Sequence, residues 1–151
     1  MPPSDTDSDK GTAGKGRRTV MRYPLGEYER DQIRSKTGKK LDELTLDEVM
    51  KGHVSSDDIK ISPETLKAQG EVAEQNGNPQ MKLNFERAAE LTAVPDDIIL
   101  KMYDKLRPNR ATKQELLSMA DELEQTYHAP TCAGLVREAA EVYERRGILL
   151  N

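Results

Sequence analysis

The sequence is poor in the large aromatic residues that carry much of the buried surface in ordinary domains. Its 151 residues include no Trp, one Phe and five Tyr, and only 35% of them are hydrophobic. The length suits one domain and hardly two. We therefore expect a lean core of Leu, Ile, Val, Ala and Met, which leaves room for stability to depend on a partner.

Features of several other protein classes are also missing. Cys132 is the single cysteine, so no internal disulfide can form, and a reduced, intracellular setting is expected. The net charge of −4 argues against general nucleic-acid binding, which favours a basic domain. No apolar run approaches the ~20 residues of a membrane span, and the N-terminus has no apolar block of a signal peptide. We expect a soluble, cytoplasmic protein that binds neither nucleic acid nor a membrane.

Residues that could support catalysis or metal binding are few. His53 and His128 lie far apart, without the cysteine or carboxylate spacing of a metal site. Cys132 could act as a nucleophile only beside a base, and a small buried residue is the simpler interpretation. The pairs Asp57-Asp58 and Asp96-Asp97 stand where helices should begin, so helix capping explains them. The sequence thus predicts no catalytic, cofactor-binding or metal-binding residue.

The N-terminal part of the chain has little regular patterning. Residues 1–20 are rich in Ser, Asp, Thr, Gly, Lys and Arg, and such a segment cannot bury enough surface to offset its ordering entropy. We expect a disordered tail there, followed by a helical domain over residues 21–151. The first part of that domain, residues 21–44, is expected to be an extended arm, because Pro24, Gly26 and Gly38 interrupt it.

Apolar residues at spacings of three and four predict helices through most of the remaining chain. Thr45 and Glu48 have the form of a capping box that begins a short helix. Further helices are expected to begin near Ser62-Pro63, Pro79, Pro95, Thr112 and Pro130. Sustained alternation, the pattern of strands, is absent. We predict an all-α fold, a small irregular bundle of about four longer helices plus one or two short ones.

Two groups of residues form a candidate subunit interface. One is the apolar element Tyr23, Pro24 and Leu25, which is expected to be extended because a residue before proline avoids the helical region. The other is a set of arginines near helix ends or among small residues: Arg87, Arg107, Arg110 and Arg137. Arginine is enriched at interfaces because its planar fork pairs well and its stem covers apolar surface. Each arginine could equally make an intrachain ion pair or a helix cap.

Several segments, taken in order, resemble the small subunit of adenosylcobalamin-dependent diol dehydratase and glycerol dehydratase. They are Tyr23-Pro24-Leu25, LDELTLDEVMKGHVSSDDIKISPETLKAQ from residue 41, NFERAAELTAVPDDIIL from residue 84, LRPNRATKQELLSMADELE from residue 106 and VREAAEVYERR from residue 136. Each segment is moderately specific, whereas their succession over roughly residues 21–147 is highly specific.

The resemblance implies a subunit without catalytic residues of its own. In this family, large, medium and small subunits assemble as a dimer of three-chain units. The large subunit, a TIM barrel, holds the diol and a metal ion, and the cobalamin lies between the large and medium subunits. The cofactor carries the radical chemistry that converts 1,2-propanediol or glycerol to an aldehyde plus water. The small subunit would dock on the large subunit as a helical clamp and stabilise it.

The resemblance leaves alternatives open. The segments do not distinguish a diol dehydratase from a glycerol dehydratase, because selectivity should lie in the large subunit. A free-standing helical adaptor or regulatory interaction protein with the same fold is the alternative function. Residues 1–20 show no apolar stripe of the kind thought to direct relatives into a bacterial microcompartment, so the tail does not support encapsulation, although another subunit could supply the signal.

Overall fold

The computed structural model describes residues 20–150, so the predicted tail lies outside the described residues apart from Val20. The elements are α1 (Leu25–Tyr28), the 3-10 turn η1 (Leu41–Glu43), α2 (Leu46–Met50), the 3-10 turn η2 (Ser56–Ile59), α3 (Pro63–Gln75), α4 (Pro79–Leu91), α5 (Asp96–Lys105), α6 (Lys113–Gln125) and α7 (Pro130–Arg146). Over this range the only β-type pairings are two isolated bridges, Arg34 with Lys40 and Ser35 with Ile61. The all-α prediction is confirmed, with five helices of ten or more residues in the described part.

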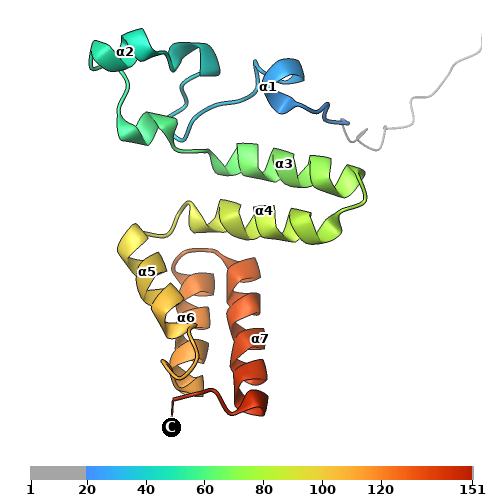
Figure 1. Ribbon diagram of the computed structural model, residues 1–151, viewed down its shortest axis with the longest axis vertical. Coiled ribbons are helices and arrows are strands. Elements are labelled where there is room, and N and C mark those ends of the chain that lie inside the picture. The colour runs from blue at the N-terminus through green and yellow to red at the C-terminus, as the bar shows by residue number, and fades with distance from the viewer. Residues whose placement is uncertain (1–19, 151) are drawn as a thin grey trace, which may run out of the picture.

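Three parts follow one another along the long axis of the molecule (Figure 1). The arm lies at one end together with α2 and η2. The hairpin of α3 and α4 crosses the middle, and α5, α6 and α7 form a bundle at the other end. The expected arm, residues 21–44, is irregular but includes two short helical turns, α1 and η1. The hairpin therefore connects the arm to the bundle.

Side-chain caps and prolines fix the starts of the longer helices where the sequence predicts them. The Ser62 hydroxyl accepts a hydrogen bond from the Thr65 amide, and Pro63 occupies the first helical position of α3. A reciprocal capping box between Thr112 and Glu115 begins α6. At the same end of the bundle, where Lys113 pairs with Glu144, α7 ends at Gly147, whose φ of 65° is left-handed. Local chemistry thus decides these helix boundaries.

The main core lies in the bundle and is built from small and aliphatic residues. Leu116 of α6 is fully buried and is the largest such side chain in the described part. Ala120 of α6 and Ala133 and Ala140 of α7 are also fully buried, and their small size lets these two helices pack closely. The buried hydrophobic residues of the described chain include no aromatic residue.

The α3–α4 hairpin depends on a close approach at Gly70. A Cβ atom at this position would lie 3.3 Å from Cβ of Phe85 on α4, tighter than an ordinary contact. Glycine therefore allows α4 to lie against α3 at this point. The turn between the two helices passes through Gly77, whose φ of 77° also favours glycine.

Glu90 joins this hairpin to the bundle. Its carboxylate accepts hydrogen bonds from the backbone amides of Thr131 at 2.9 Å and Cys132 at 2.8 Å, in the first turn of α7. The N-cap residue of α7, Ala129, has no side-chain acceptor, so Glu90 takes over the capping role from another helix. Burial raises the pKa of Glu90, but the hydrogen bonds from Thr131 and Cys132 outweigh it and lower the pKa below its usual value.

We expect Glu90→Ala to lower the free energy of unfolding by about 1 kcal/mol, the typical cost of losing a helix cap. The loss should appear in chemical denaturation at pH 7. Because the folded pKa is lowered, the contribution is present above the unfolded pKa of about 4.3 and is lost as the pH falls through the folded value. Glu86→Ala, one turn earlier on α4, removes a carboxylate that caps no helix and serves as the control; equal losses in both variants would contradict the capping role.

Candidate functional site

A groove of about 1100 Å³ lies between the arm and the α3–α4 hairpin. Its walls are mainly hydrophobic and include Tyr23, Leu25, Ile33, Leu41, Val72 and Phe85. The volume exceeds the roughly 300–1,000 Å³ of ordinary small-molecule sites, and the groove is lined from both sides by side chains. Its size and its apolar walls make it the candidate binding surface of the described chain.

The predicted apolar element lies at this groove, and its three residues have different environments. Pro24 has the extended backbone that the sequence predicts, whereas Leu25 begins α1. Leu25 is 7% exposed and so packs against this chain, whereas Tyr23 is 73% exposed. Tyr23, Pro24 and Leu25 all line the groove. The element therefore packs partly against its own chain and leaves Tyr23 available to a partner.

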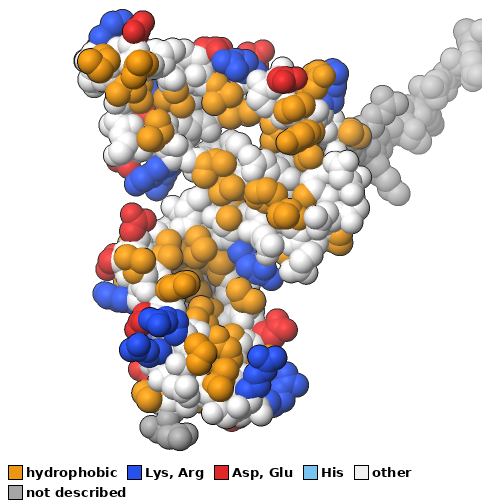
Figure 2. All heavy atoms as spheres, in the orientation of Figure 1, with side chains coloured by type: hydrophobic (Ala, Val, Ile, Leu, Met, Phe, Trp, Pro, Cys, Tyr) orange, Lys and Arg blue, Asp and Glu red, His pale blue; other side chains and the backbone are white. Residues whose placement is uncertain are grey.

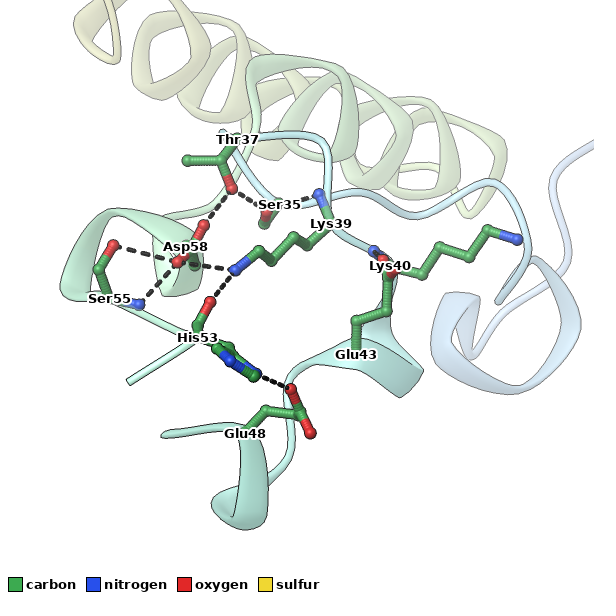
Figure 3. Close-up of polar contacts among 9 residues, drawn as sticks. All are labelled: Ser35, Thr37, Lys39, Lys40, Glu43, Glu48, His53, Ser55 and Asp58. Carbon is green, nitrogen blue, oxygen red and sulfur yellow. Dashed lines mark hydrogen bonds and ion pairs between the residues drawn. The ribbon is translucent and has the colours of Figure 1, made fainter. Parts of the chain in front are cut away.

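Asp58 fastens the arm to η2 (Figure 3). Its carboxylate is 6% exposed and accepts hydrogen bonds from the Ser55 amide at 2.6 Å and the Thr37 hydroxyl at 2.6 Å. Lys39 Nζ lies 3.1 Å from the same carboxylate and also donates to the backbone carbonyl of His53. These bonds, led by the Ser55 amide, hold the pKa of Asp58 well below its usual range. Asp58 thus acts as the predicted cap, and its bond to Thr37 also holds the segment of Ser35, which lines the groove, against η2.

Exposed hydrophobic residues mark two further surfaces that the sequence did not single out. Leu46, Val49 and Met50 share one face of α2, and Leu46 and Met50 are 75% and 80% exposed. Leu100 and Tyr103 are exposed on α5. Figure 2 shows hydrophobic side chains gathered over α2 and the arm as well as over the bundle. The signal in the sequence was an apolar triplet on α2, a helix too short to build a core.

The four predicted arginines fall into two groups by their partners. Arg137 of α7 pairs with Asp121 at 2.8 Å and Glu124 at 2.6 Å on α6, and Arg107 lies 3.6 Å from Asp104. These two arginines make the intrachain ion pairs that were the alternative interpretation of their sequence positions.

Arg87 and Arg110 have no carboxylate within ion-pair distance among residues 20–150. The Arg87 guanidinium donates from Nη1 to Asn84 Oδ1 at 2.9 Å, and its buried Nε has no hydrogen-bond partner in the described part of the chain. Arg110 is exposed in the connection between α5 and α6. Neither residue lines the groove, so the structure does not gather the predicted interface residues in one place.

The remaining candidate groups for chemistry have structural surroundings. His53 Nδ1 lies 2.8 Å from Glu48 Oε2, and the buried Cys132 has its pKa raised to about 12, chiefly by burial. Cys132 is therefore the small buried residue of the simpler interpretation. In the described range, no three His, Cys, Asp or Glu side chains are grouped to hold a metal ion. The helices between residues 20 and 150 include none long and apolar enough to cross a bilayer.

We expect Asp58→Asn to loosen the arm while leaving the bundle intact, because the charge that binds Thr37, Lys39 and Ser55 is lost. Amide hydrogen exchange over residues 35–60 should accelerate by about tenfold. In the unaltered chain the same loosening should set in below the unfolded pKa of about 3.9 and progress as the pH falls, because the folded pKa is lowered. Asp57→Asn, which affects only an exposed pair with Lys60, is the control; unchanged exchange in Asp58→Asn would exclude the fastening role.

Comparison with known proteins places these features in a family. The family model described as dehydratase small subunit matches residues 18–150. The chain is 49% identical over 127 residues to the propanediol dehydratase small subunit of Citrobacter freundii, covering 84% of this chain and 74% of that protein. It is equally similar to the propanediol dehydratase small subunit of Salmonella typhimurium, with 84% and 73% covered. A match over nearly the whole helical chain, together with these identities, shows that the protein belongs to the dehydratase small subunit family.

Proposed function

We propose that this chain is the small, non-catalytic subunit of an enzyme that converts 1,2-propanediol or glycerol to the corresponding aldehyde plus water. The observation that carries the proposal is the 49% identity to two propanediol dehydratase small subunits over 84% of the chain. The chain would dock on the large subunit and stabilise it. Its large groove and its exposed hydrophobic residues support a docking role, because contiguous exposed apolar surface marks interaction sites.

The cofactor of the proposed enzyme, adenosylcobalamin, is assigned to the other subunits. When bound, it supplies the radical chemistry of the reaction. The described residues of this chain do not fit a cobalt-ligating site: His53 and His128 lie on different elements, and neither lines the groove. The contribution of this chain would be structural, through contacts with its partners. The complete enzyme would contain large, medium and small subunits as a cytoplasmic dimer of three-chain units.

Co-expression with the large and medium subunits of a diol dehydratase tests this function. The three chains should elute as one complex and form aldehyde from 1,2-propanediol or glycerol only when adenosylcobalamin is added. Comparison of the two substrates measures the preference of the enzyme. Full activity and stability of the large and medium subunits alone would contradict a required role, and would favour a free-standing helical adaptor or regulatory protein.

Among the candidate interface residues, Arg87 is an arginine suited to a partner, because its charge meets only a neutral amide within the described chain. We expect Arg87→Ala to weaken assembly with the large subunit by about tenfold, in the range found when an arginine anchor is truncated. Turnover per assembled complex should stay unchanged. Binding is measured by titration with the large and medium subunits after the thermal stability of the variant has been recorded.

The matched control is Arg137→Ala, which removes a guanidinium already paired with Asp121 and Glu124. It should leave the affinity within about twofold of the original, since exposed ion pairs contribute little. Equal affinity of the Arg87→Ala and Arg137→Ala variants would refute the docking role of Arg87.

A further inference from the structure

The walls of the groove between the arm and the hairpin come from segments on both sides of it. Ile33, Leu41 and Leu44 belong to the arm, whereas Val72 and Phe85 belong to α3 and α4. Hydrophobic side chains gather over the arm and over the hairpin in Figure 2. Water that contacts such walls is released when apolar groups cover them, so the groove favours an apolar occupant.

Among the described residues, the charges that line the groove are of one sign. They are those of Arg34 and Lys60, in a chain whose net charge is −4. Lys60 is already paired with Asp57 at 2.9 Å. Arg34 donates to the backbone carbonyls of Asp31 at 2.6 Å and Ile33 at 2.9 Å, and within residues 20–150 no carboxylate lies within ion-pair distance of it. An apolar occupant without an anion would therefore cover an uncompensated guanidinium, which is unfavourable.

Gln69 adds a polar group to the α3 wall. It is partly buried, lines the groove, and its side-chain amide makes no hydrogen bond to the described part of the chain. The neighbouring amide of Asn76 is instead engaged with the Val72 carbonyl at 2.7 Å. A primary amide offers both a donor and an acceptor, which matches the N–H and C=O groups of an extended peptide backbone.

From this combination we infer that the groove receives an extended, mainly apolar segment of the large subunit that carries a carboxylate. Arg34 binds the carboxylate, Gln69 binds the backbone of the segment, and the hydrophobic walls cover its side chains. The planar guanidinium of Arg34 suits a carboxylate because two parallel N–H groups can donate to its two oxygens. The inference rests on the proposed function, since it names the partner segment at this surface.

Two variants of the full chain, each co-expressed with the large and medium subunits, test the inference. Arg34→Glu reverses the unpaired charge, and Ala73→Trp fills the groove from α3. Each should weaken binding to the large subunit by at least about tenfold, the size expected for a central interface residue. Lys67→Glu is the control for charge reversal. Lys67 is exposed on α3, the helix that carries Ala73, and does not line the groove. It should bind like the unaltered chain.

A cross-linking experiment identifies the occupant independently of affinity. Arg34→Lys keeps the positive charge and introduces an amine that a zero-length carbodiimide reagent joins to a carboxylate in contact with it. The expected product, mapped by mass spectrometry of the assembled complex, links position 34 to an Asp or Glu of the large subunit within an apolar stretch. Linkage to the medium subunit, to a second copy of this chain or to no partner would overturn the inference.

The outcomes separate this inference from the proposed function. If the unaltered chain fails to assemble with the large and medium subunits, the proposed function fails. If it assembles and supports aldehyde formation while Arg34→Glu and Ala73→Trp bind equally well, the groove is not the docking site and only the inference fails. Circular dichroism and thermal unfolding of each variant ensure that a loss of binding is not a loss of fold.

Discussion

The contact between Glu90 and the first turn of α7 is the one on which the arrangement of the molecule depends. It joins the hairpin, which forms one wall of the groove, to the bundle, which contains the main core. A carboxylate at a helix N-terminus satisfies free amides and meets the positive end of the helix dipole. The bundle can therefore hold the hairpin in one orientation through a short contact between α4 and α7. Because the hairpin forms one wall of the groove, this contact also sets the position of the groove relative to the bundle.

Predictions from the sequence are strongest where local chemistry decides the structure. Pro63 and the capping box of Thr112 and Glu115 act within one helical turn, so the starts of α3 and α6 follow from neighbouring residues. The link from Glu90 to Thr131 spans 41 residues and depends on how two helices pack. No local pattern carries that information.

The same reasoning explains which parts of the candidate site could be foreseen. Tyr23 stands in a distinctive apolar element beside a proline, so it could be identified before its surroundings were known. Arg34 and Gln69 gain meaning only because the fold brings the arm against α3. Arg137 showed the reverse: its position fitted an interface, but the facing helix supplies both of its carboxylates. The sequence alone does not distinguish an arginine that binds a partner from one that makes an intrachain ion pair.

The fastening of the arm by Asp58 has a consequence for the speed of complex formation. A recognition segment that is disordered before binding loses conformational entropy when it binds, and this loss reduces the net affinity. Here Thr37, Lys39 and Ser55 bond to one buried carboxylate, and these bonds hold together the segments that carry Ser35 and Ile59, which line the groove. A partner that binds in the groove, as proposed, need not wait for the arm to fold. The rate of association with such a partner would then be set by diffusion and orientation.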